Sequence, residues 1–565
     1  MPTSKKIVVV GGVATGPKAA ARARRLMPDA EITVIEKGSL VSYGSCGLPL
    51  FLEGMVRGVE ELISTASGIP RTIDYFAGEK NIRFLTGTVA ETILRDSKEV
   101  LVYNQVDKTR SKISYDELVL ATGGEPIIPP VPGTDLDGVT VLHHPDDAML
   151  IRNCLNSGAQ KIVIIGGGLI GLEAAAALSR PKRTVAVVEM QDQLLPGLLD
   201  EEIARLVQDE FEKNRVIVRT SEKLVSIEGN SEGKVQGVVT EKGVLEADLV
   251  ILACGVKPRV DLARESGLAI GPTGAITVDQ SLRTSDPFIY AAGDCVENIH
   301  LITGRPVYVP LASTANKQGR VIGNNLAGQG DTFPGVLGTG VMQVFEYNAG
   351  RTGLTEKQAR ELGYPVETVL VAGLDSAHYH PLHGGGLIKL VSHRETGRLL
   401  GAQVVGTGEM VKRLDIFVTA ISLGADLEQL GNLDLGYAPP FATPIDLGLH
   451  AINTLKNKRD GLMEALSPTE FCRLLENNEE MVVLDVRTPE EAEDRPLASD
   501  KVLRIPLYEL RGRVEEVPRG TRVVTLCELG IRAYEAVRIL QGEGREDVFY
   551  VQGGVYGLPR AILGK

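Results

Sequence analysis

Cys46 is the residue whose surroundings in the sequence most directly suggest chemistry. It lies in the segment Ser42–Pro49, soon after a glycine-rich turn near the N-terminus, and no second cysteine accompanies it. A redox enzyme with paired cysteines stores two electrons in an internal disulfide, whereas a single thiolate must form a mixed disulfide, a persulfide or a sulfenate. A redox reaction at Cys46 therefore takes one of these three forms.

A second cysteine with a chemically suggestive setting is Cys527. It follows the apolar run Arg522–Leu526 and precedes Glu528-Leu529-Gly530-Ile531-Arg532, a pattern that predicts a strand, a tight turn and a helix. A sulfur at such a turn faces backbone N–H groups and the positive helix end, which lower its pKa and stabilise anionic sulfur. Arg532 adds a cation, so we expect Cys527 and Arg532 to act together. Four other cysteines are predicted to be buried thiols: Cys154, Cys254, Cys295 and Cys472.

The elements that must position Cys46 begin at the N-terminus. The run Ile7–Val10 predicts a strand, Gly11–Gly16 predicts a phosphate-binding turn, and an Ala- and Arg-rich helix then precedes a second strand that ends at Glu36. An acid about 20 residues beyond such a turn is placed to bind ribose hydroxyls. The middle glycine of the usual G-x-G-x-x-G pattern is Val13 here, so this copy is incomplete.

A second and fuller copy of the same pattern follows. The run Lys161–Ile165 leads into Gly166-Gly167-Gly168-Leu169-Ile170-Gly171, in which all three glycine positions are filled. The next strand-like run ends at Glu189, whose carboxylate would repel the 2′-phosphate of NADP and bind the free 2′-hydroxyl of NAD. The sequence thus predicts two dinucleotide-binding βαβ folds, the second with a preference for NADH.

Composition and charge exclude several classes of protein. The chain has 565 residues, 43% of them hydrophobic, and is long enough for about three or four domains. Its 63 glycines favour phosphate-binding loops over long helices. We expect no membrane span and no signal peptide, because no apolar run reaches about 18 residues and the chain enters a strand almost at once. A net charge of -13 argues against nucleic acid as a partner. The scattered cysteines suit the cytoplasm, and we expect no metal site.

Two further segments connect these folds to a known family. The segment Leu118–Gly124 lies between the two dinucleotide folds, and Ile289-Tyr290-Ala291-Ala292-Gly293-Asp294 follows the second. In this order, the four motifs resemble the flavoproteins of the pyridine nucleotide-disulfide oxidoreductase family. The resemblance implies FAD on the first fold, NAD(P)H on the second, and a bond from Asp294 to the flavin ribityl chain. The implied cofactor-binding residues are Gly11, Gly12, Ala14, Gly16, Glu36, Lys37, Ser45, Val89, Ala121, Thr122, Gly123, Gly166, Gly168, Gly171, Glu189, Gly255, Gly293, Asp294 and Ala312.

The resemblance continues through the second half of the chain. Tyr379 and the segment Gly436–Phe441 match the family's interface domain, and the short charged stretch Leu455–Gly461 predicts a linker. Beyond it, Asp485-Val486-Arg487, the Cys527 loop and Gly553-Gly554 resemble a rhodanese (sulfurtransferase) domain. The Gly-His-Ile-Pro-Gly segment usual in rhodaneses is replaced by Ser499–Leu503.

The predicted fold class is therefore α/β, with two interleaved Rossmann-like FAD and NAD(P) domains, an α+β dimerisation domain and a C-terminal rhodanese domain. The expected bounds are 1–149 and 257–327 for the two parts of the FAD domain, 150–256 for the NAD(P)H domain, 328–455 for the interface domain and 466–565 for the rhodanese domain.

Three features separate the single-cysteine branches of this family. Its peroxidases carry a histidine in the first glycine loop, where this chain has Ala14. Its coenzyme A branch carries two interface tyrosines, matched by Tyr379 and Tyr437, and the fused rhodanese is the third feature. The chain thus most resembles NADH-dependent persulfide reductases and coenzyme A disulfide reductase/rhodanese fusions. The resemblance implies a homodimer in which both tyrosines reach the Cys46 site of the other subunit and donate a hydrogen bond or proton to the leaving sulfur.

The implied activity is the NADH-dependent reduction of a thiol persulfide, polysulfide or other sulfane sulfur at FAD and Cys46, with Cys527 accepting or delivering sulfur. Coenzyme A is the expected thiol carrier, and its phosphates would need cations. The candidate substrate-binding residues are Arg22, Arg25, Ser42, Arg71, Lys80 and Asn316. Three departures from the family pattern leave the carrier open: Ser45 for an asparagine, His380 for a second tyrosine, and Ile445 for a basic residue. The alternatives are a coenzyme A disulfide reductase, an NADH oxidase, and a sulfur carrier or sensor without net reduction.

Overall fold

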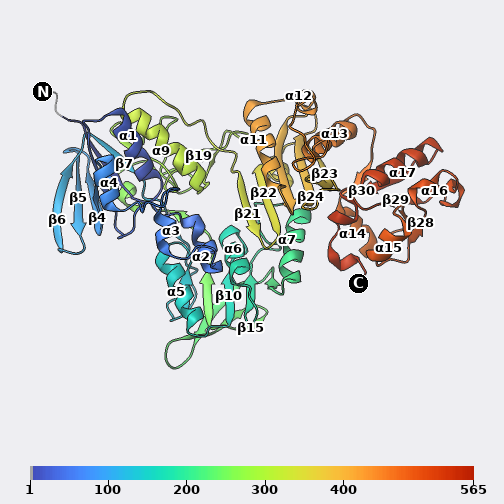
Figure 1. Ribbon diagram of the computed structural model, residues 1–565, viewed down its shortest axis with the longest axis horizontal. Helices are drawn as coiled ribbons and strands as arrows, with labels where there is room; N and C mark the ends of the chain where they lie inside the picture. Colours follow the sequence, from blue (N-terminus) through green and yellow to red (C-terminus); the bar gives the residue numbers. More distant parts are fainter. Residues whose placement is uncertain (1–3, 565) are drawn as a thin grey trace. The chain divides into compact units, whose positions relative to one another are not determined.

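Residues 4–564 are described by the computed structural model, in which the chain divides into two units. The first unit runs to Val188 and resumes from Glu222 to Val336. The second unit comprises Glu189–Ser221 and the chain from Leu337 onward (Figure 1). Within residues 4–564, no helix combines the length and apolar character that a membrane span requires.

The first sheet of the first unit is parallel and is built from the predicted apolar runs. Ile7, Val9 and Leu118 are fully buried, as expected for a parallel sheet covered on both faces. Burying each such side chain stabilises the fold by about 1.5–3 kcal/mol. The second strand ends at Ile35, one residue before the predicted end, so Glu36 follows the sheet. The order β18-β7-β1-β2-β3 joins β1 (Lys6–Val10), β2 (Glu31–Ile35), β3 (Arg83–Leu85), β7 (Glu117–Leu120) and β18 (Ile289–Ala291).

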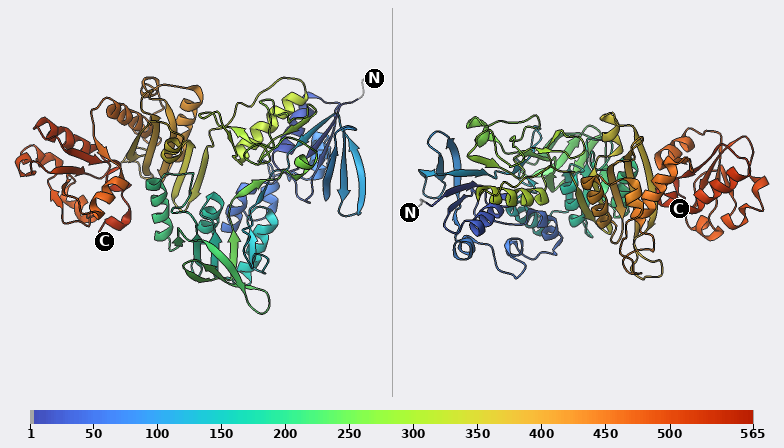
Figure 2. Two further views of the ribbon diagram at one scale, coloured as in Figure 1. Left: turned by 180° about the vertical axis from the view of Figure 1, so that it is seen from behind. Right: turned by 90° about the horizontal axis from the view of Figure 1, so that it is seen from above.

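Different layers cover the two faces of this sheet. Ala19, Ala20 and Ala23 of helix α1 are buried in one core cluster with Ile322 of helix α9, because small side chains let the helices approach the sheet closely. The other face packs on a three-stranded antiparallel sheet, seen from behind in Figure 2. These layers comprise α1 (Thr15–Leu26), α9 (Ala312–Leu326), β4 (Thr88–Leu94), β5 (Glu99–Asn104) and β6 (Thr109–Ser114).

The second parallel sheet has the order β11-β10-β16-β9 within the first unit. Its central strand Lys161–Ile165 has the predicted bounds, and Ile164 is fully buried. Its strands and helices are β9 (Val139–Val141), β10 (Lys161–Ile165), β11 (Thr184–Val188), β16 (Leu249–Leu252), α5 (Pro145–Asn156) and α6 (Leu169–Leu178). An antiparallel sheet beside it comprises β13 (Leu224–Gly229), β14 (Val235–Thr240) and β15 (Gly243–Glu246). Shorter elements of this unit are α2 (Leu48–Glu53), α3 (Val59–Ile63), α4 (Ile73–Lys80), β8 (Gly124–Pro126), β17 (Val256–Pro258), α8 (Asp261–Glu265), β19 (Asn298–Ile299) and β20 (Pro306–Val307).

The second unit contains a five-stranded antiparallel sheet with the order β21-β22-β25-β24-β23. Every residue of β25 is buried, and helices α7, α11 and α13 pack on the sheet (Figure 1). The elements are α7 (Glu201–Lys213), β12 (Ile217–Arg219), β21 (Gly340–Val344), β22 (Tyr347–Gly353), α10 (Glu356–Glu361), β23 (Val366–Leu374), β24 (Gly385–His393), β25 (Leu399–Gly406), α11 (Leu414–Leu423), α12 (Leu427–Gly431) and α13 (Leu447–Arg459).

The predicted linker Leu455–Gly461 is mostly helical, so that prediction was wrong. Helix α13 continues to Arg459, and Leu455 is fully buried in it. The charges that suggested a linker are Lys456, Lys458 and Arg459 in the last turn, where cations are favoured by the negative end of a helix.

The C-terminal part of the second unit is a parallel sheet with the order β26-β30-β29-β27-β28. Strand β29 (Arg522–Leu526) has the bounds predicted from the sequence. Gln552 and Tyr556 join this part to the antiparallel sheet of the same unit, since Leu370 N donates to Gln552 Oε1 at 2.8 Å and Tyr556 donates to Gly385 O at 2.8 Å. The other elements are β26 (Ala465–Leu466), α14 (Pro468–Glu476), β27 (Met481–Asp485), α15 (Pro489–Asp494), β28 (Val502–Arg504), α16 (Leu507–Leu510), α17 (Ile531–Gly542) and β30 (Val548–Val551).

Candidate active site

Cys46 lies in the short 3-10 helix Ser45–Gly47, which leads directly into α2. The residue is exposed, and it lines a cavity of about 550 Å³ within the first unit. Cavities of this size are typical of sites for small molecules. The thiol is therefore open to a substrate that enters this cavity.

Charged groups around Cys46 set the balance between thiol and thiolate. Surrounding protein atoms partly desolvate the sulfur and raise the pKa of Cys46, and the carboxylate of Glu173 raises it further. A hydrogen bond with the Ser45 side chain acts in the opposite direction. Burial in helix α6 raises the pKa of Glu173 itself to about 7. Sequence reasoning missed Glu173, although one carboxyl in an otherwise apolar helix is a recognisable signal of a special environment.

Most of the residues predicted to bind a thiol carrier line the same cavity as Cys46. These are Arg25, Ser42, Arg71, Lys80 and Asn316. The cavity also includes Lys18 and Tyr75, which sequence reasoning missed, and Lys80 Nζ lies 5.2 Å from the centre of the Tyr75 ring. The cluster of cations beside an aromatic ring can bind an anionic group together with a flat, apolar one.

Arg22 is not part of this cavity, in contrast to the prediction. Its Nε donates a hydrogen bond to Asn324 Oδ1 at 2.6 Å, so the guanidinium is engaged with helix α9. An added Cβ at Gly323 would lie 2.5 Å from Arg22 Cβ, which shows how closely the two helices pack there. The spacing placed Arg22 and Arg25 on one face of α1, but α9 covers the part of that face that carries Arg22.

The first glycine turn has the backbone that a pyrophosphate-binding turn requires. Gly11 has a φ of +113°, and an added Cβ would lie 2.0 Å from Ala121 O, so no larger residue fits. Gly12 N donates to Glu36 Oε2 at 2.7 Å, which holds the buried acid against the turn. This geometry fits the phosphate-binding end of FAD.

The residues around Asp294 fit the other end of the same cofactor. Burial raises the pKa of Asp294 to about 6, so this carboxyl lies in a poorly solvated position where a polar ligand group would satisfy it. Gly293 before it has a φ of +83°, and an added Cβ would lie 2.5 Å from Thr15 Oγ1. Val13, at the incomplete position of the turn, lines the Cys46 cavity.

The remaining predicted FAD residues lie in the first unit. Most of them follow strands β1, β2 and β7 or stand near the beginnings of α1, β4 and α9: Ala14, Gly16, Lys37, Val89, Thr122, Gly123 and Ala312. Ser45 begins the 3-10 helix that carries Cys46. Because the carboxyl ends of parallel strands meet at one edge of a sheet, most of these residues share the edge where ligands bind in such folds.

The second glycine turn leaves room for a ligand at one specific residue. Among residues 4–564, no atom lies within 4 Å of a Cβ added at Gly168, whereas one added at Gly171 would lie 2.1 Å from Gly166 O. Gly168 is thus open toward the approach of a pyrophosphate, and Gly171 is required for packing of the turn. Glu189 is buried, and one of its oxygens accepts a hydrogen bond from Gln191 N at 2.8 Å. Gly255, the last predicted residue of this site, has a φ of +101°.

Tyr379 and Tyr437 lie together on the surface of the second unit. A side-chain hydrogen bond between the two hydroxyls raises the pKa of Tyr437. The residues are 65% and 49% exposed, so both phenols are accessible. The fold therefore brings together two predicted catalytic residues that are far apart in the sequence.

A buried arginine holds the two tyrosine-bearing segments in place. Arg413 Nη2 lies 2.8 Å from the Asp446 carboxylate, and the same nitrogen donates a hydrogen bond to Asp375 O at 2.6 Å. The Asp375 side chain also accepts a hydrogen bond from Gly384 N at 2.7 Å, and this bond closes the loop that carries Tyr379. Asp446 caps α13, directly after the segment that carries the second tyrosine.

Cys527 lies at the predicted strand-to-helix turn. Strand β29 ends at the preceding residue, and the sulfur accepts the N–H groups of Gly530 at 3.1 Å and Ala533 at 3.3 Å. Arg532 pairs with Glu491 at 2.7 Å, a bond that raises the pKa of Arg532, and it also hydrogen-bonds Cys527. The turn thus holds the sulfur with N–H donors and one paired guanidinium, which suits an anionic or persulfidated sulfur.

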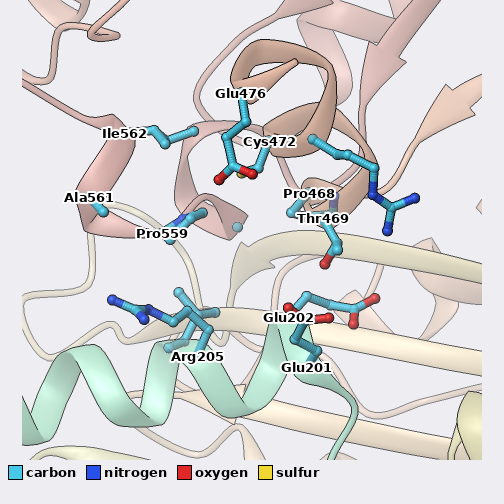
Figure 3. A pocket seen from close by; sticks show the side chains of 13 residues that line it. Glu201, Glu202, Arg205, Pro468, Thr469, Cys472, Glu476, Pro559, Ala561 and Ile562 are labelled. Atoms are coloured by element: carbon cyan, nitrogen blue, oxygen red, sulfur yellow. The ribbon is translucent and has the colours of Figure 1, made fainter. Parts of the chain in front are cut away.

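The other four cysteines differ partly from the prediction. Cys295 is buried, whereas Cys154, Cys254 and Cys472 are only half-buried. Cys472 lines a second cavity of about 390 Å³ in the second unit (Figure 3).

This second cavity does not activate its cysteine. Figure 3 shows Cys472 and Glu476 on the wall opposite Glu201 and Glu202. Burial and the charges of Glu476 and Glu201 raise the pKa of Cys472 to about 11. The thiol is therefore protonated near neutral pH and is a poor nucleophile.

Comparison with protein families gives three matches along the chain. Residues 5–319 match the pyridine nucleotide-disulphide oxidoreductase family, residues 341–446 match the dimerisation domain of that family, and residues 467–559 match the rhodanese-like domain. These matches confirm the predicted α/β class and the predicted combination of domains.

The similarity to individual relatives extends over nearly the whole length of those relatives. A NAD(P)H coenzyme A polysulfide/persulfide reductase of Pyrococcus horikoshii is 37% identical over 442 residues, or 78% of this chain and 95% of the relative. Among solved structures, a NAD-dependent persulfide reductase from A. fulgidus is 42% identical, has a TM-score of 0.93 and covers 98% of this chain and 99% of its own. The CoADR-RHD protein of Bacillus anthracis is 33% identical, with a TM-score of 0.91 over 100% of this chain and 99% of its own.

Proposed function

The chain belongs to the pyridine nucleotide-disulphide oxidoreductase family and is an FAD-dependent NAD(P)H oxidoreductase, and from this premise we propose that it reduces persulfides at Cys46. The substrate class is a thiol persulfide, polysulfide or other sulfane sulfur, and the products are the thiol and sulfide. NADH is the proposed reductant, because Glu189 follows the second dinucleotide fold. We place the enzyme in the cytoplasm.

The proposed reaction at Cys46 is a thiol–disulfide type of exchange. The Cys46 thiolate attacks the outer sulfur of a persulfide R–S–SH, the R–S bond to that sulfur breaks, and the thiolate R–S⁻ leaves with the electron pair. Cys46 then carries the persulfide Cys46–S–SH. FAD on the first glycine turn, with hydride from NADH, would supply the two electrons that release sulfide and restore the Cys46 thiolate.

One observation carries this proposal: the lone Cys46 opens into a cavity that also holds Arg25, Arg71 and Lys80. A single sulfur requires an external sulfur partner, and the cations suit a substrate with phosphate groups. Coenzyme A has this chemistry, and the Pyrococcus horikoshii relative is named as a coenzyme A polysulfide/persulfide reductase. We therefore propose coenzyme A persulfide as the substrate.

The two exposed tyrosines support a role in a homodimer. We propose that Tyr379 and Tyr437 of one subunit reach the Cys46 cavity of the other and donate a proton or hydrogen bond to the leaving thiolate. Their mutual hydrogen bond leaves at least one hydroxyl able to donate outward. The match to a dimerisation domain at residues 341–446 supports this arrangement.

The decisive experiment measures NADH consumption and sulfide release with coenzyme A persulfide under anaerobic conditions. Cys46→Ser should retain FAD and lose at least about 10³-fold in turnover, because its hydroxyl is a far weaker nucleophile. The half-buried Cys154→Ser is the matched control and should remain active. Full persulfide turnover by Cys46→Ser would contradict the proposal, and equal efficiency with NADPH would contradict the NADH preference.

A second candidate function is coenzyme A disulfide reduction, favoured by the match of the whole chain to the CoADR-RHD protein. Turnover of coenzyme A disulfide that exceeds turnover of the persulfide would favour it. Steady NADH consumption in aerated buffer without a sulfur substrate would instead indicate an NADH oxidase. The absence of sulfide release under excess NADH would indicate a sulfur carrier.

A further inference from the structure

The loop that holds Cys527 carries no net charge. Its five residues after the cysteine include one acid, Glu528, and one base, Arg532. The residues between them are Leu529, Gly530 and Ile531, and Ile531 is 53% exposed. The rim of this sulfur site is therefore partly apolar and electrically balanced.

The arginines around this loop are each paired with a carboxylate. Arg532 pairs with Glu491 at 2.7 Å, and Arg495 pairs with Glu528. Arg487 is fully buried, and it lies 2.8 Å from its neighbour Asp485 and 3.8 Å from Glu528. Glu528, which directly follows the reactive cysteine, thus compensates the charge of Arg495 and lies near a second guanidinium that Asp485 already pairs.

Further hydrogen bonds fix the residues of these ion pairs in place. Glu491 closes the capping box of α15, because its second carboxylate oxygen accepts Thr488 N at 2.9 Å. Arg487 also donates to Glu491 O at 3.2 Å and to Arg495 O at 2.9 Å. The backbone oxygen of Glu528 is fixed by Tyr556 N at 3.1 Å. The charge balance is therefore a built feature of the loop and of α15.

A balanced site discriminates between sulfur donors by their charge. A small dianion such as thiosulfate places two negative charges beside the attacking thiolate and needs unpaired cations to offset the repulsion. The persulfide of an organic thiol presents an uncharged S–SH group to the cysteine and keeps its charges at a distance. An apolar rim further favours the organic donor.

We propose that the Cys527 site accepts sulfur from organic thiol persulfides and discriminates against thiosulfate, and that Glu528 is the residue that sets this specificity. The inference deepens the sulfur-handling role in the proposed function and rests on the sulfurtransferase assignment of the C-terminal domain. It does not depend on reduction at Cys46.

The transfer step needs no external electrons. The Cys527 thiolate attacks the outer sulfur of R–S–SH, a new S–S bond forms, and the bond between the two donor sulfurs breaks. The thiolate R–S⁻ leaves with the electron pair, and Cys527–S–SH keeps the proton of the transferred sulfur. Backbone N–H groups of Gly530 and Ala533 are placed to stabilise the sulfur at Cys527.

The test is a sulfur-transfer assay on the full-length protein without NADH, with cyanide as the acceptor and thiocyanate as the product. Rates are compared for glutathione persulfide and thiosulfate, after subtraction of the rate of Cys527→Ser. Wild-type protein should use the persulfide at least ten times more efficiently in kcat/KM. Glu528→Gln, which leaves Arg495 without its carboxylate while Arg487 keeps Asp485, should raise the ratio of the thiosulfate to the persulfide kcat/KM about tenfold.

A second variant and a control keep the test independent of folding defects. Glu491→Gln frees Arg532 and should also raise the thiosulfate rate, whereas Glu493→Gln, on an exposed site of the same helix, should not. Wild-type protein that uses thiosulfate as well as the persulfide would overturn the proposal. So would an unchanged donor ratio in both Glu528→Gln and Glu491→Gln. If the wild-type protein transfers no sulfur from either donor, the sulfurtransferase assignment is rejected. NADH-dependent persulfide reduction is measured separately and reports on Cys46.

Discussion

The hydroxyl of Tyr556 donates a hydrogen bond to the backbone oxygen of Gly385 at 2.8 Å, and this contact links the C-terminal sheet to the antiparallel sheet of the same unit. The turn that carries Tyr556 also fixes the reactive loop, because Val555 N donates to Cys527 O at 2.9 Å. One turn therefore serves both the docking contact and the loop geometry of the second reactive cysteine.

Replacing Tyr556 by phenylalanine should loosen both features. The lost hydrogen bond should cost about 0.5–1.5 kcal/mol of stability, and faster amide exchange at Gly530 and Ala533 should follow. Urea denaturation and hydrogen exchange measure the two effects. Tyr508→Phe, at a 73% exposed tyrosine, is the control. Amide protection at the Cys527 loop identical to wild type would show that the turn does not couple the two features.

The ion pair between Arg413 and Asp446 allows a test of how much a buried charge pair contributes to stability. Arg413→Met leaves Asp446 without its guanidinium in a position where both side chains are buried. Removal of one partner of such a pair should cost about 3–5 kcal/mol, seen as a lower urea midpoint. The double variant Arg413→Met/Asp446→Asn should recover part of this loss, because no unpaired charge remains. A double variant as unstable as the sum of the single ones would show that the pair is not coupled.

The same substitution should affect different properties at two glycines of the second turn. Gly168→Ala places its methyl group where no atom of the described residues lies within 4 Å, so the protein should fold normally but bind NADH at least about tenfold more weakly. Gly171→Ala would bring a methyl group to 2.1 Å from a backbone oxygen and should instead lower the melting temperature. KM for NADH and thermal unfolding separate these outcomes. Normal NADH affinity in Gly168→Ala would show that the pyrophosphate of NADH does not bind at this turn.

The sequence was sufficient for features that depend on local pattern. The runs Lys161–Ile165 and Arg522–Leu526 became strands with those bounds, since β-branched and aliphatic residues between turn signals favour strands wherever they pack. The strand-to-helix turn at Cys527 follows for the same reason. Such features need only the chemistry of neighbouring residues.

The sequence was insufficient where tertiary packing decides. Arg22 and Arg25 are alike in spacing and charge, but α9 covers only Arg22. The charged segment after Leu455 forms the end of a helix, because the apolar residues before it are buried against the sheet. The proximity of Glu173 to Cys46 arises from two elements that are distant in the chain and could not be read from spacing.

The pair formed by Glu173 and Cys46 predicts an effect on thiol reactivity. Because the charged Glu173 carboxylate raises the pKa of Cys46, Glu173→Gln should lower that pKa and increase the thiolate fraction at pH values above about 7, where Glu173 is ionised. Alkylation of Cys46 by iodoacetamide at about pH 8 should become several-fold faster, because only the thiolate reacts. Mass spectrometry of the Cys46 peptide gives the rate. Glu60→Gln, at an exposed carboxyl, should leave it unchanged. An equal alkylation rate in Glu173→Gln would exclude this electrostatic coupling.

A buried cluster around Lys389 predicts how stability depends on pH. Lys389 is 2% exposed and lies 3.1 Å from Asp200, 2.7 Å from Glu202 and 2.8 Å from Glu356. Burial alone would raise the pKa of Asp200 and of Glu356, but the ammonium and further hydrogen bonds outweigh it and lower both values. A carboxyl with a lowered pKa binds fewer protons in the folded than in the unfolded state. The cluster is thus fully stabilising above the unfolded pKa values of about 4, and this contribution is lost as the pH falls further.

Lys389→Met should therefore remove about 3–5 kcal/mol of stability at pH 7 by leaving buried carboxylates unpaired. The difference from wild type should shrink as the pH falls below about 4, where protonated carboxyls no longer need the ammonium. Urea midpoints at pH 7 and pH 3.5 or so measure both values. Lys357→Met, at an exposed lysine beside Glu356, should cost little at either pH. A Lys389→Met deficit that stays constant across this range would assign the loss to packing of the lysine stem instead of its charge.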